Sequence, residues 1–151
     1  MTLASPAHFA ATRGASSAAR TGDLLVFAAN GAGFASLAAR VPDIKQQLGL
    51  SPSGLGVLLL AVSVGSLLGL PLAGRVAHRI GAARAVRTGL AIFTPGLLLS
   101  AVAVTLHAPT GLIMAGLFLV GLGNGLWDVS QNLEGTVIEQ ASGRAIMPWF
   151  H

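Results

Sequence analysis

Four polar side chains follow one another along an otherwise apolar stretch near the C-terminal end of the chain. They are Asn124, Asp128, Gln131 and Asn132. Their spacing of i, i+4, i+7 and i+8 puts them on one face of a helix. A carboxylate within an apolar membrane span is costly and usually functional, so Asp128 is a candidate for proton uptake and release. The amides both donate and accept hydrogen bonds, as binding of a polar solute such as a sugar requires.

Each of these residues also has a purely structural interpretation. Asp128 could be bonded to Asn124, Asn132 or a neighbouring helix for packing alone, and an interhelical hydrogen bond contributes only about 0.6 kcal/mol on average. Asn30, in the first apolar segment, is open to the same two interpretations. Trp127 could anchor the helix at a membrane interface or stack on a sugar ring.

The composition places the chain in a lipid bilayer. Of the 151 residues, 53% are hydrophobic and 9% are charged, and the mean hydropathy is +0.74. Soluble domains carry about 25% charged residues. The net charge of +4 would indicate nucleic acid in a soluble protein, but here the basic residues flank apolar runs, so no nucleic-acid partner is predicted. The four histidines lack metal-binding spacing, and we predict neither a metal nor a cofactor.

Four apolar segments are each long enough to cross a membrane as a helix. The predicted architecture is therefore an all-α integral membrane protein. Its spans are expected at about 23–41, 53–73, 86–106 and 110–135. The remaining ends, residues 1–22 and 140–151, are expected to be a disordered cytoplasmic tail and a short cytoplasmic end.

Local signals set the expected helix ends. Asp23 is a plausible N-cap of the first span, and Pro42 is expected to end that span at Val41. Ser51 and Pro52 have the residue types of an N-cap and a first helical position. Glycines four residues apart, Gly65 with Gly69 and Gly121 with Gly125, form small-residue faces for close helix packing.

Basic residues concentrate in one connection. Residues 75–87 hold four arginines and no acid, whereas 42–52 and 107–110 hold few charges. The bias of Lys and Arg toward the cytoplasm therefore puts 75–87 and the N-terminus on the cytoplasmic side of the membrane.

Three features resemble the major facilitator superfamily, in particular its fucose-permease-like branch. The first is Asn30-Gly31 followed by Ala39-Arg-Val-Pro-Asp-Ile44 and a Gly-rich second helix. The second is Gly74-Arg-Val-Ala-His-Arg-Ile-Gly-Ala-Ala-Arg84, which is similar to the family's G-x-x-x-D-R-x-G-R-R signature. The third is Asp128-Val-Ser-Gln-Asn132, followed by Glu134-Gly135 and later Gly143-Arg144. Together they cover residues 24–151.

This resemblance implies proton-coupled alternating access, in symport with the solute. In the second motif it implies a cytoplasmic gate whose residues are Gly74, His78, Arg79, Gly81 and Arg84. His78 stands where the family has Asp, which puts that gate in doubt. Asp128 aligns with the acid of helix four, whereas the acid of helix one falls near Ala38 and is missing. Fucose itself is therefore not implied as the substrate.

The family has twelve helices in three-plus-three inverted repeats, and this chain supplies about four. We therefore expect a fragment of a transporter, truncated before a fifth helix and unable to transport without the missing helices. One alternative is a non-transporting remnant. Another is a small membrane protein that self-associates through Gly65/Gly69 and Gly121/Gly125. An intramembrane enzyme would need a second acid at the depth of Asp128, so no enzymatic activity is predicted.

Overall fold

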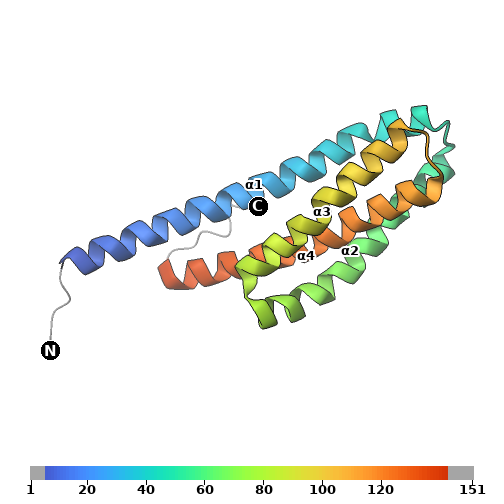
Figure 1. Cartoon of the computed structure of the whole chain (residues 1–151). Helices are drawn as coiled ribbons and strands as arrows, with labels where there is room; N and C mark the ends of the chain where they lie inside the picture. The colour runs from blue at the N-terminus through green and yellow to red at the C-terminus, as the bar shows by residue number, and fades with distance from the viewer. Residues whose placement is uncertain (1–5, 143–151) are drawn as a thin grey trace.

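The computed structural model describes residues 6–142, which form four consecutive helices (Figure 1). These are α1 (Pro6–Gln47), α2 (Pro52–Ile80), α3 (Ala82–Thr105) and α4 (Thr110–Ser142). Each contains a stretch that is long and apolar enough to cross a membrane. The stretches are Thr21–Gln47, Pro52–Ile80, Ala82–Thr105 and Thr110–Val137. The all-α membrane architecture with four spans is thus confirmed.

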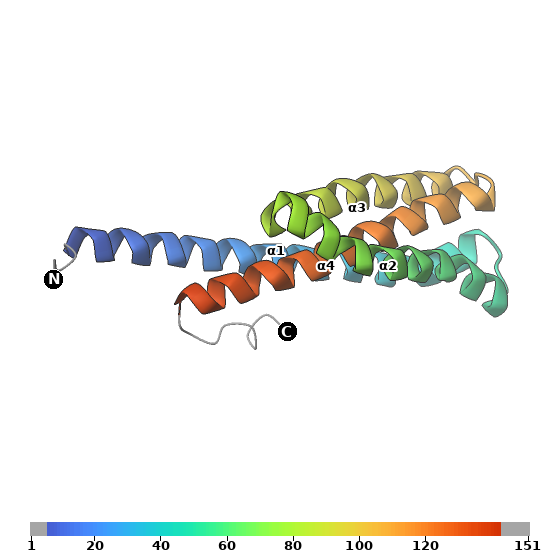
Figure 2. The same ribbon diagram turned by 90° about the horizontal axis from the view of Figure 1, so that it is seen from below.

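Helix α4 is the centre of the bundle. It packs along both α2 and α3, while α1 makes a smaller contact with α4 and only touches α3. The N-terminal part of α1 extends past the ends of the other three helices (Figures 1 and 2). Most large apolar side chains on the outer faces of α2 and α3, such as Leu67 and Leu98, are exposed, as expected of surfaces that contact lipid.

Glycines let α2 and α3 approach α4 on two of its sides. A Cβ atom on Gly125 would lie 2.7 Å from the backbone oxygen of Ser66 in α2, and one on Gly116 would lie 2.6 Å from the backbone nitrogen of Ser100 in α3. The Ser66 hydroxyl donates to the Gly121 carbonyl at 3.1 Å. This confirms the predicted close packing.

One alternative was that the same glycine faces pair two copies of the chain, and the structure uses them within one chain instead. Gly65 and Gly69 of α2 lie against α4, and Gly121 and Gly125 of α4 lie against α2. All four are buried within one chain. A second copy therefore has no access to them.

Helix α1 is longer than the sequence indicated. Residues 6–22 are helical, where a disordered tail was expected, because Pro6 suits a first helical position and the segment is rich in alanine. Asp23 is accordingly in the helix interior and is not an N-cap. Pro42 does not end the helix, which runs on to Gln47. Pro42 is exposed, and proline inside a helix removes one backbone hydrogen bond without necessarily ending it.

The connection between α2 and α3 is a single residue. Gly81 has φ +87°, a conformation that favours glycine, and its N–H donates to the Ala77 carbonyl at 2.8 Å. The expected loop over 75–87 is therefore wrong: the helices continue to Ile80 and from Ala82. This is possible because a left-handed glycine reverses the chain within one residue.

The start of α2 matches the sequence signal. Ser51 Oγ accepts a hydrogen bond of 3.1 Å from the Gly54 N–H, and Pro52 is the first helical residue. Pro71 and Pro95 lie inside α2 and α3, which continue through them. The expected cytoplasmic end falls partly on α4, up to Ser142, and otherwise lies outside the described residues.

Candidate solute-binding face

Helix α1 buries one narrow stripe. Asp23, Asn30, Leu37 and Ile44 are each at most 9% exposed and are spaced by seven residues, or about two helical turns. The two residues nearer the N-terminus are polar and the other two are apolar. Asp23 Oδ2 and Asn30 Nδ2 are buried without a hydrogen-bond partner among the described residues. The sequence analysis named Asn30 as a candidate but interpreted Asp23 as an N-cap. The seven-residue spacing of Asp23 and Asn30 could have shown that both lie on one stripe of the helix.

The central feature of α4 is a pair of side chains one turn apart. Gln131 is 2% exposed, and its Nε2 donates to Asp128 Oδ1 at 3.2 Å. Gln131 Oε1 is buried with no partner in the part of the chain that the structure describes. Asp128 itself is half-buried. The pair thus holds an oriented carboxylate beside an amide oxygen that can still accept a hydrogen bond.

Asn124 and Asn132 lie one turn on either side of Asp128. Asn124 Oδ1 is buried without a partner. Asn132 Nδ2 donates to the backbone carbonyl of Asp128 at 2.8 Å, so this amide is engaged with its own helix. Of the two asparagines, Asn124 is therefore the stronger candidate for contact with a solute.

The three sides of α4 have different roles. Gly121 and Gly125 approach α2, and Gly116 and Gly123 approach α3. At 100° per residue, Asn124 and Gln131 fall on the side between these two faces, and Asp128, seven residues after Gly121, falls at the edge of that side next to α2. Because α1 is the other helix that packs on α4, this polar side of α4 lies toward α1. We call Asp23, Asn30, Asn124, Asp128 and Gln131 the polar face.

Trp127 packs against α3. Its ring lies edge-to-face on Phe93 of α3, with centroids 5.8 Å apart and planes at 85°, and the residue is 3% exposed. One residue step along a helix is a rotation of about 100°, which turns Trp127 away from Asp128, although Trp127 is one turn from both Asn124 and Gln131. The ring contact therefore places Trp127 in the α3–α4 core, at the edge of the polar face.

Each of α1 and α4 carries a shielded acid. Asp23 of α1 is buried, and Glu134 of α4 is half-buried one turn after Gln131. The sequence comparison had suggested that α1 lacks an acid because its expected position falls at Ala38, which is exposed. Asp23 is such an acid on α1, two turns before Asn30.

The residues expected to form a gate lie around the α2–α3 corner. Gly74, His78 and Arg79 are exposed in the last turns of α2, Gly81 is the corner itself, and Arg84 is exposed in the first turn of α3. Because consecutive helices alternate in direction, this corner lies at the same end of the bundle as Asp23 and Glu134 (Figure 1).

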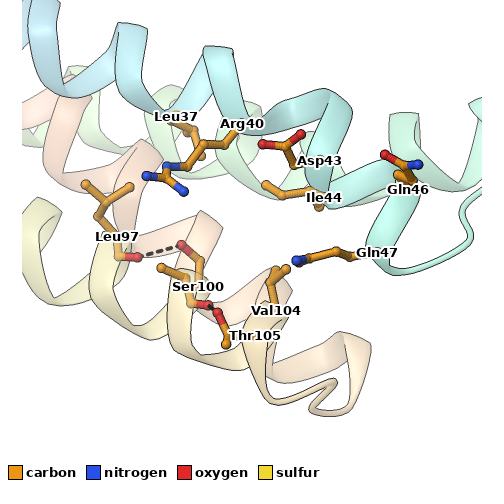
Figure 3. Close-up of a pocket in the computed structure, with 11 residues that line it drawn as sticks. Leu37, Arg40, Asp43, Ile44, Gln46, Gln47, Leu97, Ser100, Val104 and Thr105 are labelled. Carbon is orange, nitrogen blue, oxygen red and sulfur yellow. Dashed lines mark hydrogen bonds between the residues drawn. The ribbon is translucent and has the colours of Figure 1, made fainter.

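A cleft of about 320 Å³ lies between α1 and α3 toward the opposite end (Figure 3). Its walls include Arg40, Asp43, Gln47, Ser100 and Thr105. The Ser100 hydroxyl donates to the Leu97 carbonyl at 2.9 Å and the Thr105 hydroxyl to the Ala101 carbonyl at 2.8 Å. Arg40, Asp43 and Gln47 are exposed. Because its hydroxyls already donate within α3 and Arg40, Asp43 and Gln47 are exposed, the cleft is a weaker candidate than the polar face.

The antiparallel spans, the close glycine packing and an acid-bearing face between two helices define a multi-pass membrane protein of the transporter type. Comparison with known proteins agrees. The family model of the Major Facilitator Superfamily matches residues 24–143, and the chain belongs to this family. Its members are membrane transporters and not enzymes.

The similar proteins are bacterial. The chain is 35% identical to an uncharacterized MFS-type transporter of Yersinia pestis over 84% of this chain and 32% of the relative. It is 33% identical to an uncharacterized transporter, y4wD, of Sinorhizobium fredii, over 83% of this chain and 32% of the relative. Membrane protein MosC of Rhizobium meliloti is 31% identical over 83% of this chain and 30% of the relative. The chain thus spans about a third of the length of these relatives. No solved structure matches it significantly.

Proposed function

We propose that this chain contributes α1 and α4 to the solute pathway of a transporter of the fucose-permease-like branch, which moves a small polar solute by proton-coupled alternating access. The observation that carries the proposal is the polar face. Asn30 and Gln131 are at least nine-tenths buried, yet each keeps a side-chain atom without a partner. Such groups are costly in a membrane unless a ligand, water or another helix satisfies them.

Asp128 is the proposed proton-binding group. It is the acid of the central span region of α4, and its described side-chain contact is a neutral amide, Gln131. Taking up a proton there removes a charge beside the solute, which changes both solute affinity and the cost of enclosing the site. The residues at the α2–α3 corner are the proposed cytoplasmic gate, where Arg79 and Arg84 flank Gly81.

The proposed orientation has the N-terminus and the α2–α3 corner in the cytoplasm of the inner membrane. It is supported by four arginines between 75 and 87. The chain has no cysteine, so Ala83→Cys at the corner and Ser53→Cys at the other end report orientation directly. A membrane-impermeant maleimide should label Ser53→Cys in intact cells and Ala83→Cys only after permeabilisation. The reverse pattern would overturn the orientation.

Transport is tested with the polypeptide that carries this chain, purified into vesicles with an imposed pH gradient. Candidate solutes are screened for accumulation driven by the gradient. Asp128→Asn should abolish accumulation while leaving exchange of solute down its own gradient. Asp43→Asn, an exposed acid near the other end of α1, should change neither. Unchanged accumulation in Asp128→Asn would refute proton coupling through this residue.

The 151-residue chain alone is expected to give no saturable uptake. It supplies about a third of the relatives' length, and a solute enclosed by α1 and α4 alone lacks most of its walls. Saturable uptake by the chain alone would show that four spans suffice and would favour a small self-sufficient membrane protein.

A further inference from the structure

The polar face has an uneven charge. Residues 21–39 of α1 and 110–142 of α4 contain Asp23, Asp128, Glu134 and Glu139 and not one Lys, Arg or His. Asp23 is 6% exposed with a buried, unpartnered Oδ2, and Asp128 is half-buried. The basic residues of α1 lie outside this range: Arg20 is one turn before Asp23, and Arg40 directly follows residue 39. The α1–α4 segments that would line the solute pathway therefore carry a net negative charge.

The uncharged groups do not compensate for this charge. Gln131 donates one hydrogen bond to Asp128, and the other donor of its amide and the Asn30 amide are neutral dipoles. Four buried α4 atoms have no partner among the described residues: Gln131 Oε1 and Asn124 Oδ1 are acceptors, the Ser130 hydroxyl can donate or accept, and Trp127 Nε1, in the α3–α4 core, is a donor. Carboxylates accept hydrogen bonds and do not donate them when ionised. A ligand that fits this lining must bring donors and, to balance the carboxylates, a positive charge.

On the basis of the proposed transport function, we propose that the α1–α4 face selects an organic cation: a small solute that carries an ammonium group and further hydrogen-bond donors. The ammonium would lie near Asp128, and the other donors would reach the amides of Gln131 and Asn124. An anionic solute, such as a sugar acid or a sugar phosphate, would be repelled by every charged group on the face.

The size of the electrostatic energies favours selection of the solute by its charge over selection by neutral hydrogen bonds. At the intermediate dielectric of a protein site, a single carboxylate within about 4–8 Å changes the relative concentration of monovalent cations and anions by about tenfold or more. A hydrogen bond between neutral groups discriminates less. Asp23 and Glu134 add further negative charge toward the end of the bundle that holds the α2–α3 corner.

The absence of cysteine in the chain permits a direct measurement of this potential without knowing the solute. The polypeptide that carries the chain, with any cysteine beyond residue 151 replaced by serine, receives a single Asn124→Cys substitution. Two thiol reagents of similar size are compared: cationic trimethylammonium-ethyl methanethiosulfonate and anionic sulfonato-ethyl methanethiosulfonate. The control is Ser53→Cys, which is exposed at the start of α2. Asn30→Cys provides a second position should Asn124→Cys fold poorly.

The ratio of the cationic to the anionic reaction rate should be at least about tenfold higher at Asn124→Cys than at Ser53→Cys. Adding Asp128→Asn should lower the ratio severalfold at Asn124→Cys and leave it unchanged at Ser53→Cys. A ratio equal to the control, or folded variants that react with neither reagent at position 124 or 30, would overturn the proposal. The uptake assay tests the proposed transport separately. If solute is taken up but the rate ratio at Asn124→Cys equals that of the control, only the proposed selection of cations is refuted. If the rate ratio is high but no solute is taken up, only the proposed transport is refuted.

Discussion

The side-chain amide of Gln131 donates a hydrogen bond of 3.2 Å to the carboxylate of Asp128, one turn earlier on α4. Gln131 is almost fully buried, so its rotamer is fixed by packing, and it in turn fixes the direction of the carboxylate. The partner that orients this half-buried carboxylate is therefore neutral. On this relationship we base the proposal that α4 contributes to the solute site.

Gln131→Met keeps the volume of the side chain and removes the amide. A hydrogen bond to a charged group is worth about 1.5–3 kcal/mol, so we expect the KM of the transported solute to rise about tenfold or more while the protein stays folded. The matched control is Thr136→Val, an exposed residue whose hydroxyl donates to the Asn132 carbonyl within α4. Equal KM values for the two variants would contradict a role of Gln131 at the solute site.

Gly121→Ala tests the contact between α2 and α4. A Cβ atom there would overlap the backbone of Val62, and overpacking of this kind costs about 1–3 kcal/mol. Gly111→Ala on the same helix meets no atom within 4 Å and should be neutral or stabilising, since alanine is the better helix former. Thermal unfolding in detergent, followed by circular dichroism, should show a lower midpoint for Gly121→Ala. Equal midpoints would mean that the helices do not pack as described.

Trp127→Leu separates the packing role from sugar stacking. Loss of the edge-to-face pair with Phe93 removes about 0.5–1.5 kcal/mol in addition to lost packing, so the unfolding midpoint should fall. The KM for solute should not change, because the ring points toward α3. A raised KM at an unchanged midpoint would restore Trp127 as a solute contact.

Gly81→Ala tests the α2–α3 corner. A residue with a Cβ atom at φ +87° carries a strain of roughly 1–2 kcal/mol, so the variant should unfold at lower temperature. Gly74→Ala, within α2 and with nothing within 4 Å, should not. If Gly81 also serves as the hinge of the gate, transport should slow in Gly81→Ala even at temperatures where it is fully folded.

Several elements could be predicted from local sequence because local physics decides them. Hydropathy and length set the four spans, and Ser51 followed by Pro52 set the start of α2. Gly65 and Gly69 were correctly assigned to helix packing, although their partner was not known. The helical spacing of Asn124, Asp128 and Gln131 correctly indicated one shared face.

Other features were fixed by the tertiary structure. Pro42 was wrongly predicted to end the first helix, because a helix can tolerate an exposed proline. Residues 6–22 were wrongly predicted to be disordered, because a helix can continue beyond the membrane. Asp23 resembled an N-cap, and only the packing of α1 on α4 shows that it is buried near Glu134. Trp127 differs from Asp128 by one residue, yet it belongs to the α3 side.

The sequence by itself determined that the protein is a four-span helical membrane protein with an acid-bearing fourth helix, because periodicity and hydropathy are properties of each segment. Which side of α4 each helix occupies depends on contacts between segments far apart in the chain. Those contacts, made possible by glycines such as Gly116 and Gly121, left one side of α4 for α1 and buried Asp23 and Asn30 of α1.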